Sequence, residues 1–218
     1  MEQNIYQIAI DGPSGAGKST IAKALAATLK IDYIDTGAMY RAIGYKIVRE
    51  GVDMYDEAAL EAMLKTTDVD LSEGKVLLDG EDVSGKIRTP EMSKMASDCS
   101  ALGAVRVKLV ELQRGMAKSK SVIMDGRDIG TVVLPNADLK IYLVASAEER
   151  ALRRYHESVA KGMTVSLEQL TEDMKARDHY DMNREASPLR KADDAVELDT
   201  THLSIDAVVE TVLNLIKK

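Results

Sequence analysis

Residues 12–19 combine three glycines with a lysine and two serines at a spacing suited to phosphate chemistry. They read Gly-Pro-Ser-Gly-Ala-Gly-Lys-Ser and match the pattern G-x-x-x-x-G-K-[ST]. The glycines let several backbone N–H groups point inward, and the start of the following helix adds positive potential. We therefore predict a nucleotide-binding loop in which Lys18 reaches the β- and γ-phosphates; ATPases, GTPases and small-molecule kinases share this loop. The residues expected to bind the nucleotide are Gly12, Pro13, Ser14, Gly15, Ala16, Gly17, Lys18, Ser19 and Thr20.

Two oxygen-bearing side chains are candidates for holding Mg²⁺ beside these phosphates. Ser19 closes the loop pattern, and Asp125 directly follows the apolar run 122–124. Proteins with this loop hold Mg²⁺ partly through the loop hydroxyl and partly through an acidic residue at the end of a strand. Together with the loop, the pair therefore predicts that a nucleotide binds here with Mg²⁺.

Short apolar runs alternate with amphipathic helical patterns along most of the chain. The runs expected to form strands are 5–10, 33–34, 122–124, 139–144 and 195–198. The expected helices are 19–29, 38–50 closed by Gly51, one opened by a capping box at 146–149, and one capped by Ser204. Such alternation is typical of a parallel sheet covered by helices on both faces. We predict an α/β fold of the P-loop NTPase type.

Two stretches depart from this alternation. Residues 69–87 carry the turn signals Glu73-Gly74 and Asp79-Gly80 around a short apolar run, which indicates a small antiparallel β insertion. Residues 150–191 hold nine Lys or Arg and seven Asp or Glu, so this segment is locally basic in an acidic protein. We interpret it as two arginine-rich helices with a polar joint.

The composition narrows the classes of protein to which the chain can belong. A net charge of −7 and a pI of about 5.1 argue against a general nucleic-acid binder. The single cysteine, Cys99, excludes an intrachain disulfide and fits a reducing compartment. We expect no leader peptide, because residues 1–5 carry no basic region and no long apolar stretch. No run approaches the ~18 apolar residues of a membrane span. We expect a cytoplasmic monomer that binds neither nucleic acid nor a membrane.

Four further blocks make the chain similar to a known family. Residues 35–41 read Asp-Thr-Gly-Ala-Met-Tyr-Arg, and residues 125–133 read Asp-Gly-Arg-Asp-Ile-Gly-Thr-Val-Val. The other two blocks lie at 80–89 and at 177–184. In this order they resemble bacterial cytidylate kinases, which are nucleoside monophosphate kinases, over nearly the whole chain. The phosphate loop itself is less specific, and some family members have Gly where this chain has Ser19.

The resemblance implies a particular division of the chain. It implies a single P-loop kinase domain over residues 1–218, with a core of about 1–65, 100–148 and 192–218. An acceptor-binding insertion covers about 66–99, and a helical, lid-like segment covers about 150–191.

The resemblance also implies the reaction, in which the γ-phosphoryl group of ATP moves to CMP or dCMP to give ADP and CDP or dCDP. Because the acceptor phosphate is already a nucleophile, positioning and charge neutralisation matter more than a general base. Arginine grips phosphate oxygens with two N–H groups and suits this task. The catalytic residues implied are Lys18, Arg127, Arg153, Arg177 and Arg184. The CMP-binding residues implied are Thr36, Tyr40, Arg41, Ser97, Arg106, Arg127, Asp128, Asp181 and Arg184.

Base choice follows from the hydrogen-bonding groups of cytosine. The resemblance assigns the base to Asp128, Arg106 and Ser97, and the ribose to Asp181. A carboxylate accepts from the 4-amino group of cytosine, while an arginine donates to N3 or O2. Uracil would turn a carbonyl toward Asp128, and buried groups would lose their partners.

Other classes of function stay open at the level of the residues. The kinase could use another acceptor, such as UMP, GMP or a non-nucleotide. The chain could instead be an ATP-dependent switch without an acceptor, or a nucleic-acid-binding ATPase. We find no N-K-x-D pattern for a guanine base, which argues against a GTPase.

Overall fold

A computed structural model describes residues 5–72 and 74–216 of the chain. The described residues divide into two compact units. The first unit runs up to Tyr33 and resumes at Lys120, and the second unit is Ile34–Ser119. The turn residue Glu73 and residues 1–4, on which the expected absence of a leader rests, lie outside the described residues.

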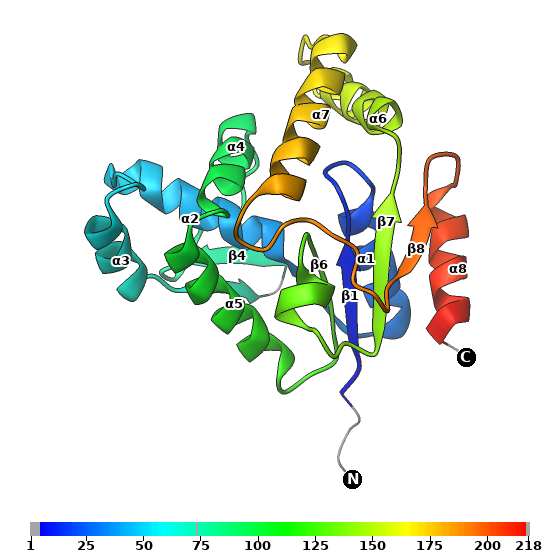
Figure 1. The fold of residues 1–218 in the computed structure, drawn as a ribbon, viewed down its shortest axis with the longest axis horizontal. Coiled ribbons are helices and arrows are strands. Elements are labelled where there is room, and N and C mark those ends of the chain that lie inside the picture. The colour runs from blue at the N-terminus through cyan, green and yellow to red at the C-terminus, as the bar shows by residue number, and fades with distance from the viewer. Residues whose placement is uncertain (1–4, 73, 217–218) are drawn as a thin grey trace. The chain divides into compact units, whose positions relative to one another are not determined.

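A five-stranded sheet forms the centre of the first unit (Figure 1). Its strands are β1 (Gln7–Asp11), β2 (Asp32–Asp35), β6 (Val122–Gly126), β7 (Leu139–Val144) and β8 (Val196–Asp199). They lie in the order β2-β6-β1-β7-β8, and β1 is parallel to both of its neighbours. β7 and β8 are also parallel. The predicted α/β fold with a parallel sheet is therefore confirmed.

Apolar side chains on both faces of β1 suit its place at the centre of the sheet. Ala9, on one face, is fully buried. Ile8 and Ile10, on the other face, are also fully buried, and they pack with Leu25 of α1 (Lys18–Leu29) and Val212 of α8 (Ile205–Ile216). A strand buried on both faces reads as a continuous apolar run, as residues 8–10 do. Figure 1 shows α1 and α8 side by side next to the sheet.

Serine residues set the starts of the helices in the second half of the chain. The Ser146 hydroxyl accepts a hydrogen bond from the Glu149 N–H and opens α6 (Ala147–Ala160), which confirms the predicted cap. Ser166 caps α7 (Leu167–Asn183), and Ser204 caps α8. The predicted pair of helices over the lid-like segment is thus α6 and α7. Among the helices of the described ranges, none is both long and apolar enough to cross a membrane.

The second unit contains the expected small antiparallel sheet, which has three strands in the order β3-β4-β5. The elements of this unit are α2 (Thr36–Glu50), α3 (Glu57–Lys65), β3 (Val69–Ser72), β4 (Lys75–Leu78), β5 (Glu81–Asp82), α4 (Pro90–Cys99) and α5 (Gly103–Ala117). The helix α2 begins two residues earlier than predicted. The Asp35 carboxylate accepts from the Ala38 N–H at 2.8 Å and so caps the helix before Thr36.

A π-helical turn, η1 (Ile129–Val133), follows β6 and was not predicted. Two backbone hydrogen bonds span five residues: the Val133 N–H donates to the Asp128 carbonyl, and the Leu134 N–H donates to the Ile129 carbonyl. Such turns are rare and are frequently found at functional sites. Here the turn directly follows the Gly-Arg-Asp sequence at 126–128.

The buried thiol of Cys99 gives a test of the packing in the second unit. Cys99 is fully buried, and burial raises the pKa of its thiol to about 12. Because only the thiolate reacts, we expect Ellman's reagent to label the native protein about a thousandfold more slowly than an exposed cysteine. In guanidinium chloride one thiol per chain should react at once. Rapid labelling of the native protein would contradict this packing.

Candidate functional site

The phosphate loop wraps closely around the carboxyl end of β1. The Lys18 ammonium donates to the Pro13 carbonyl at 2.7 Å, which holds the lysine over the loop. Gly12 has a φ of +147°, and a Cβ at this position would lie 2.2 Å from the Leu143 carbonyl oxygen. Only glycine fits here, so the close approach of the loop to β7 requires the first glycine of the motif.

Lys18 lies in a buried group of charges that belong to the first unit. Burial, together with the cations Arg127 and Arg177, lowers the pKa of Lys18 to about 7. The carboxylates of Asp125 and Asp11 act in the opposite direction. An anion bound at this place would favour the charged form of Lys18. The structure therefore brings three cations together where the motif predicts phosphates.

The predicted metal ligands Ser19 and Asp125 are in contact. The Ser19 hydroxyl donates to Asp125 Oδ2 at 2.8 Å, although the residues are far apart in sequence. Asp125 is buried, and its other oxygen accepts from the Tyr33 hydroxyl at 2.8 Å. Tyr33 was not predicted, because nothing in the sequence links it to residue 125. A hydroxyl and a carboxylate are oxygen donors, as Mg²⁺ prefers.

The described residues contain no cluster of three or more His, Cys, Asp or Glu side chains that could hold a metal ion. A divalent cation at Ser19 and Asp125 would therefore take its remaining ligands from nucleotide phosphates and water. Mg²⁺ is commonly bound in this way in sites that use ATP.

Arginines of the lid-like segment meet the loop after β6 at one buried carboxylate. Arg127 Nε donates to Asp181 Oδ2 at 2.9 Å, and Arg177 Nε lies 3.8 Å from the same oxygen. Burial alone would raise the pKa of Asp181, but Arg127 and Arg177 hold this pKa below its usual range. Arg184 adds to this field, and its Nε donates to the Ser187 carbonyl. The first unit thus brings together four of the predicted site residues: Arg127, Arg177, Asp181 and Arg184.

Arg153 lies on α6, and its contacts are with the segment after β8. Its guanidinium donates to Glu149 at 3.1 Å and to the Thr200 carbonyl at 2.6 Å. The Thr200 hydroxyl in turn donates to the carbonyl of Ala16 in the phosphate loop at 3.3 Å. Arg153 is therefore linked to the loop through Thr200.

Arg150, one turn earlier on α6, contacts the phosphate loop directly and was not among the predicted site residues. Its guanidinium donates to the Ser14 carbonyl and to the Ala145 carbonyl, both at 2.9 Å. It also forms a two-point ion pair with Asp178 of α7. The side chain is only 4% exposed. Arg150 therefore joins the loop, α6 and α7.

The second unit brings together several of the residues expected to bind CMP. Thr36, Tyr40 and Arg41 lie on the first two turns of α2, and Arg41 pairs with Asp35 at 3.1 Å. Arg106 of α5 is buried and donates to the Tyr40 hydroxyl at 3.2 Å. Ser97 lies on α4, where it is half-buried.

Asp128 is buried at the start of η1, next to a carboxylate that was not predicted. Asp11 ends β1, and it accepts hydrogen bonds from the backbone N–H groups of Ile129 and Gly130. In the sequence, Asp11 is an ordinary residue at a strand end. Its partners lie more than a hundred residues away, so no local pattern could have revealed them.

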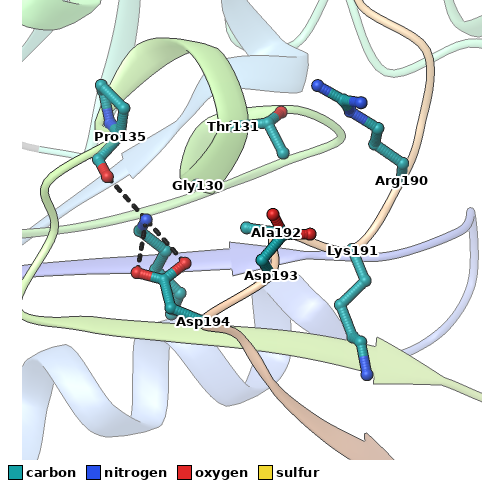
Figure 2. Close-up of a pocket in the computed structure, with 9 residues that line it drawn as sticks. Gly130, Thr131, Pro135, Arg190, Lys191, Ala192, Asp193 and Asp194 are labelled. Carbon is teal, nitrogen blue, oxygen red and sulfur yellow. Dashed lines mark hydrogen bonds and ion pairs between the residues drawn. The ribbon is translucent and has the colours of Figure 1, made fainter.

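A pocket of about 290 Å³ lies beside η1 in the first unit (Figure 2). Figure 2 shows the side chains of Arg190 and Lys191 pointing in opposite directions, so their charges do not converge on one point. None of the predicted site residues lines this pocket. The lining residues are Gly130, Thr131, Pro135, Lys140, Arg190, Lys191, Ala192, Asp193 and Asp194.

The parallel sheet, the phosphate loop at its central strand and the Ser19–Asp125 pair define a nucleotide-binding protein of the P-loop class. A solved shikimate kinase from Bacteroides thetaiotaomicron has a similar fold, with a TM-score of 0.51 and 13% identity. The comparison covers 98% of this chain and 99% of that structure.

Sequence comparison assigns the family within this class. The profile of the cytidylate kinase family matches residues 8–218. A cytidylate kinase from Caldicellulosiruptor bescii is 53% identical, over 97% of this chain and 95% of the relative. A cytidylate kinase from Bacillus subtilis is 50% identical, over 100% of this chain and 99% of the relative. The chain belongs to the cytidylate kinase family, as its sequence blocks predicted.

Replacing Arg150 by methionine tests the junction between the loop, α6 and α7. We expect the free energy of unfolding to fall by about 3 kcal/mol, because Asp178 and the Ser14 carbonyl would lose a buried charged partner. For a chain of this length that corresponds to a midpoint of thermal unfolding lower by roughly 6–12 °C. Differential scanning calorimetry would measure this midpoint.

The matched control is Arg154→Met on the same helix, since the Arg154 side chain is 44% exposed. We expect its midpoint to change by no more than about 2 °C. Equal effects of the two substitutions would show that Arg150 does not hold this junction.

Proposed function

We propose that the protein transfers the γ-phosphoryl group of ATP to CMP or dCMP, giving ADP and CDP or dCDP. It is thus a transferase of pyrimidine nucleotide metabolism. The observation that carries this proposal is the similarity to cytidylate kinases over nearly the full chain. Membership of that family does not favour another acceptor or an ATP-dependent switch.

The donor side of the reaction uses the phosphate loop. Lys18 and the inward N–H groups of the phosphate loop would bind the β- and γ-phosphates. Because Lys18 is buried, the negative charge of the phosphates would be balanced where water has little access. Ser19 and Asp125 have the donor atoms to hold Mg²⁺, and Tyr33 orients Asp125. A bound Mg²⁺ would neutralise charge on the phosphate oxygens.

Arginines supply the charge on the acceptor side. In the first unit, Arg127 would grip the phosphate of CMP, while Arg177 and Arg184 of the lid-like segment would approach the transferring group. We assign Arg153 to the transferring group as well. To reach it, Arg153 would have to leave its present contacts with Glu149 and Thr200. In the second unit, Arg41 would hold the CMP phosphate. Such contacts mainly neutralise charge and align the phosphates.

Cytosine would be selected by groups whose hydrogen-bonding roles are fixed. Asp128 would accept from the 4-amino group, and Arg106 and Ser97 would donate to the acceptor atoms of the ring. Thr36 and Tyr40 complete the proposed CMP contacts on α2. Asp181 would accept from the ribose, for which its low pKa keeps it ionised.

The lid-like segment, residues 150–191, would close over the substrates and keep water away from the transferring group. Its direct bond to the phosphate loop through Arg150 supports such a role. We further propose that the enzyme acts as a cytoplasmic monomer, in keeping with its buried, free thiol.

A panel of acceptors tests the proposed function. The protein would be incubated with ATP, Mg²⁺ and either CMP, dCMP, UMP, AMP or GMP, and ADP release would be followed in a coupled assay. We expect rapid turnover with CMP and dCMP, slow turnover with UMP, and negligible turnover with the purine nucleotides. Turnover that is fastest with another acceptor would refute the base assignment.

The variant Asp128→Asn tests whether Asp128 selects cytosine over uracil. The amide has nearly the size of the carboxylate but can donate to the 4-carbonyl of uracil. We expect the ratio of kcat/KM for CMP to that for UMP to fall by about 10²-fold. An unchanged ratio would place the recognition of the base elsewhere.

Closure of the lid-like segment gives a separate prediction. Hydrogen exchange in residues 150–191 should be slower with ATP and CMP bound than in the free protein, because closure buries these helices. Exchange in α8 serves as the internal reference. Equal exchange of the lid-like segment in both states would contradict closure.

A further inference from the structure

Asp11 is placed at the junction of two loops. It is the last residue of β1, and the phosphate loop begins at the next residue, Gly12. Its side chain is buried, and its two oxygens accept from two successive backbone N–H groups. Asp11 Oδ1 accepts from Ile129 at 2.8 Å, and Asp11 Oδ2 accepts from Gly130 at 2.7 Å.

Strand register explains why these groups meet. β1 and β6 run parallel, with Asp11 paired to Gly126. The chain leaves β6 at this level, passes through Arg127 and Asp128, and returns to the Asp11 side chain at Ile129. One carboxylate therefore connects the start of the donor loop to the backbone that carries Arg127 and Asp128.

The same backbone is confined from a second side by Lys140. A Cβ at Gly130 would lie 3.1 Å from Lys140 Cδ and 3.4 Å from Asp11 Oδ2, so the turn is packed tightly between both side chains. Lys140 is itself fixed, because its ammonium donates to the Pro135 carbonyl and to Asp194. In Figure 2, dashed lines mark the interactions of Pro135 and Asp194.

Burying the ionised carboxylate of Asp11 costs free energy. Burial raises the pKa of Asp11 to about 7, although the Gly130 and Ile129 N–H groups partly offset the effect. An apolar residue would avoid that cost, but it would leave two buried N–H groups without an acceptor. Bonds from a carboxylate to backbone N–H groups are stronger than neutral ones and restrict the backbone more tightly.

We propose that Asp11 is a positioning residue for phosphoryl transfer, which sets the backbone of Arg127 and Asp128 relative to the phosphate loop. This inference rests on the proposed function. Arg127 and Asp128 are the proposed contacts to the phosphate and the base of CMP, so a displacement of their backbone would weaken the binding of CMP but not that of ATP. A displacement of about 1 Å can also slow the transfer itself 10²-fold. Asp11 acts through the backbone of η1 and touches neither substrate.

The test compares Asp11→Asn with Asp11→Ala. Asparagine keeps one acceptor oxygen and alanine keeps none, so we expect a graded loss. The KM for CMP should rise about tenfold in Asp11→Asn and about a hundredfold in Asp11→Ala, while the KM for ATP changes less than about threefold. A role in folding alone would reduce the amount of native protein without this difference between the two substrates.

Asp138→Asn is the matched control. Asp138 also accepts a backbone hydrogen bond from β1, from Gln7 at 2.7 Å, but it lies at the opposite end of the strand and is exposed. We expect its kinetic constants to equal those of the unchanged protein. If Asp11→Asn does not fold, Gly130→Ala displaces the same backbone by contact with Lys140, and it should raise the KM for CMP selectively.

The outcomes separate this inference from the proposed function. If the unchanged protein fails to phosphorylate CMP, the proposed function is wrong. If the unchanged protein phosphorylates CMP but the folded variants of Asp11 and Gly130 keep its KM for CMP, Asp11 is not a positioning residue. An equal rise in the KM for ATP and for CMP would also overturn the inference.

Discussion

Three cations are held together at the carboxyl end of β1, and the rest of the first unit is arranged around this constraint. Burial and the positive charges of Arg127 and Arg177 lower the pKa of Lys18 to about 7. Asp181 pairs with the two arginines, while the carboxylates of Asp125 and Asp11 offset only part of the effect of burial and the arginines on Lys18. A bound polyphosphate would favour the charged form of Lys18. In the proposed function, ATP is this polyphosphate.

Carboxylates hold the cations in place. Asp181 binds Arg127, and Asp178 binds Arg150, which also donates to the Ser14 carbonyl of the phosphate loop. Each of these pairs joins α7 to the region around the loop. A movement of α7 would therefore change the surroundings of the phosphate loop directly. This coupling gives a physical basis for the proposed closure of the lid-like segment.

Local sequence patterns predicted the parts of the protein whose physics is local. The phosphate loop and the Ser146 cap each depend on a few neighbouring residues, and both were predicted correctly. Arg150 was missed, because only the angle at which α6 packs decides which arginine of the helix faces Ser14. Asp11 was missed because its partners lie 118 and 119 residues along the chain. The turn η1 depends on such distant contacts and leaves no periodic signal.

Competition between acceptors tests most directly the claim that the protein transfers a phosphoryl group from ATP to CMP. Equal concentrations of CMP, UMP and GMP would be incubated with the protein, Mg²⁺ and a limiting amount of ATP, and the products would be identified by mass spectrometry. We predict that CDP is the main new diphosphate and that its amount equals that of the ADP formed. ADP formed with inorganic phosphate and no CDP, or UDP or GDP as the main product, would contradict the claim.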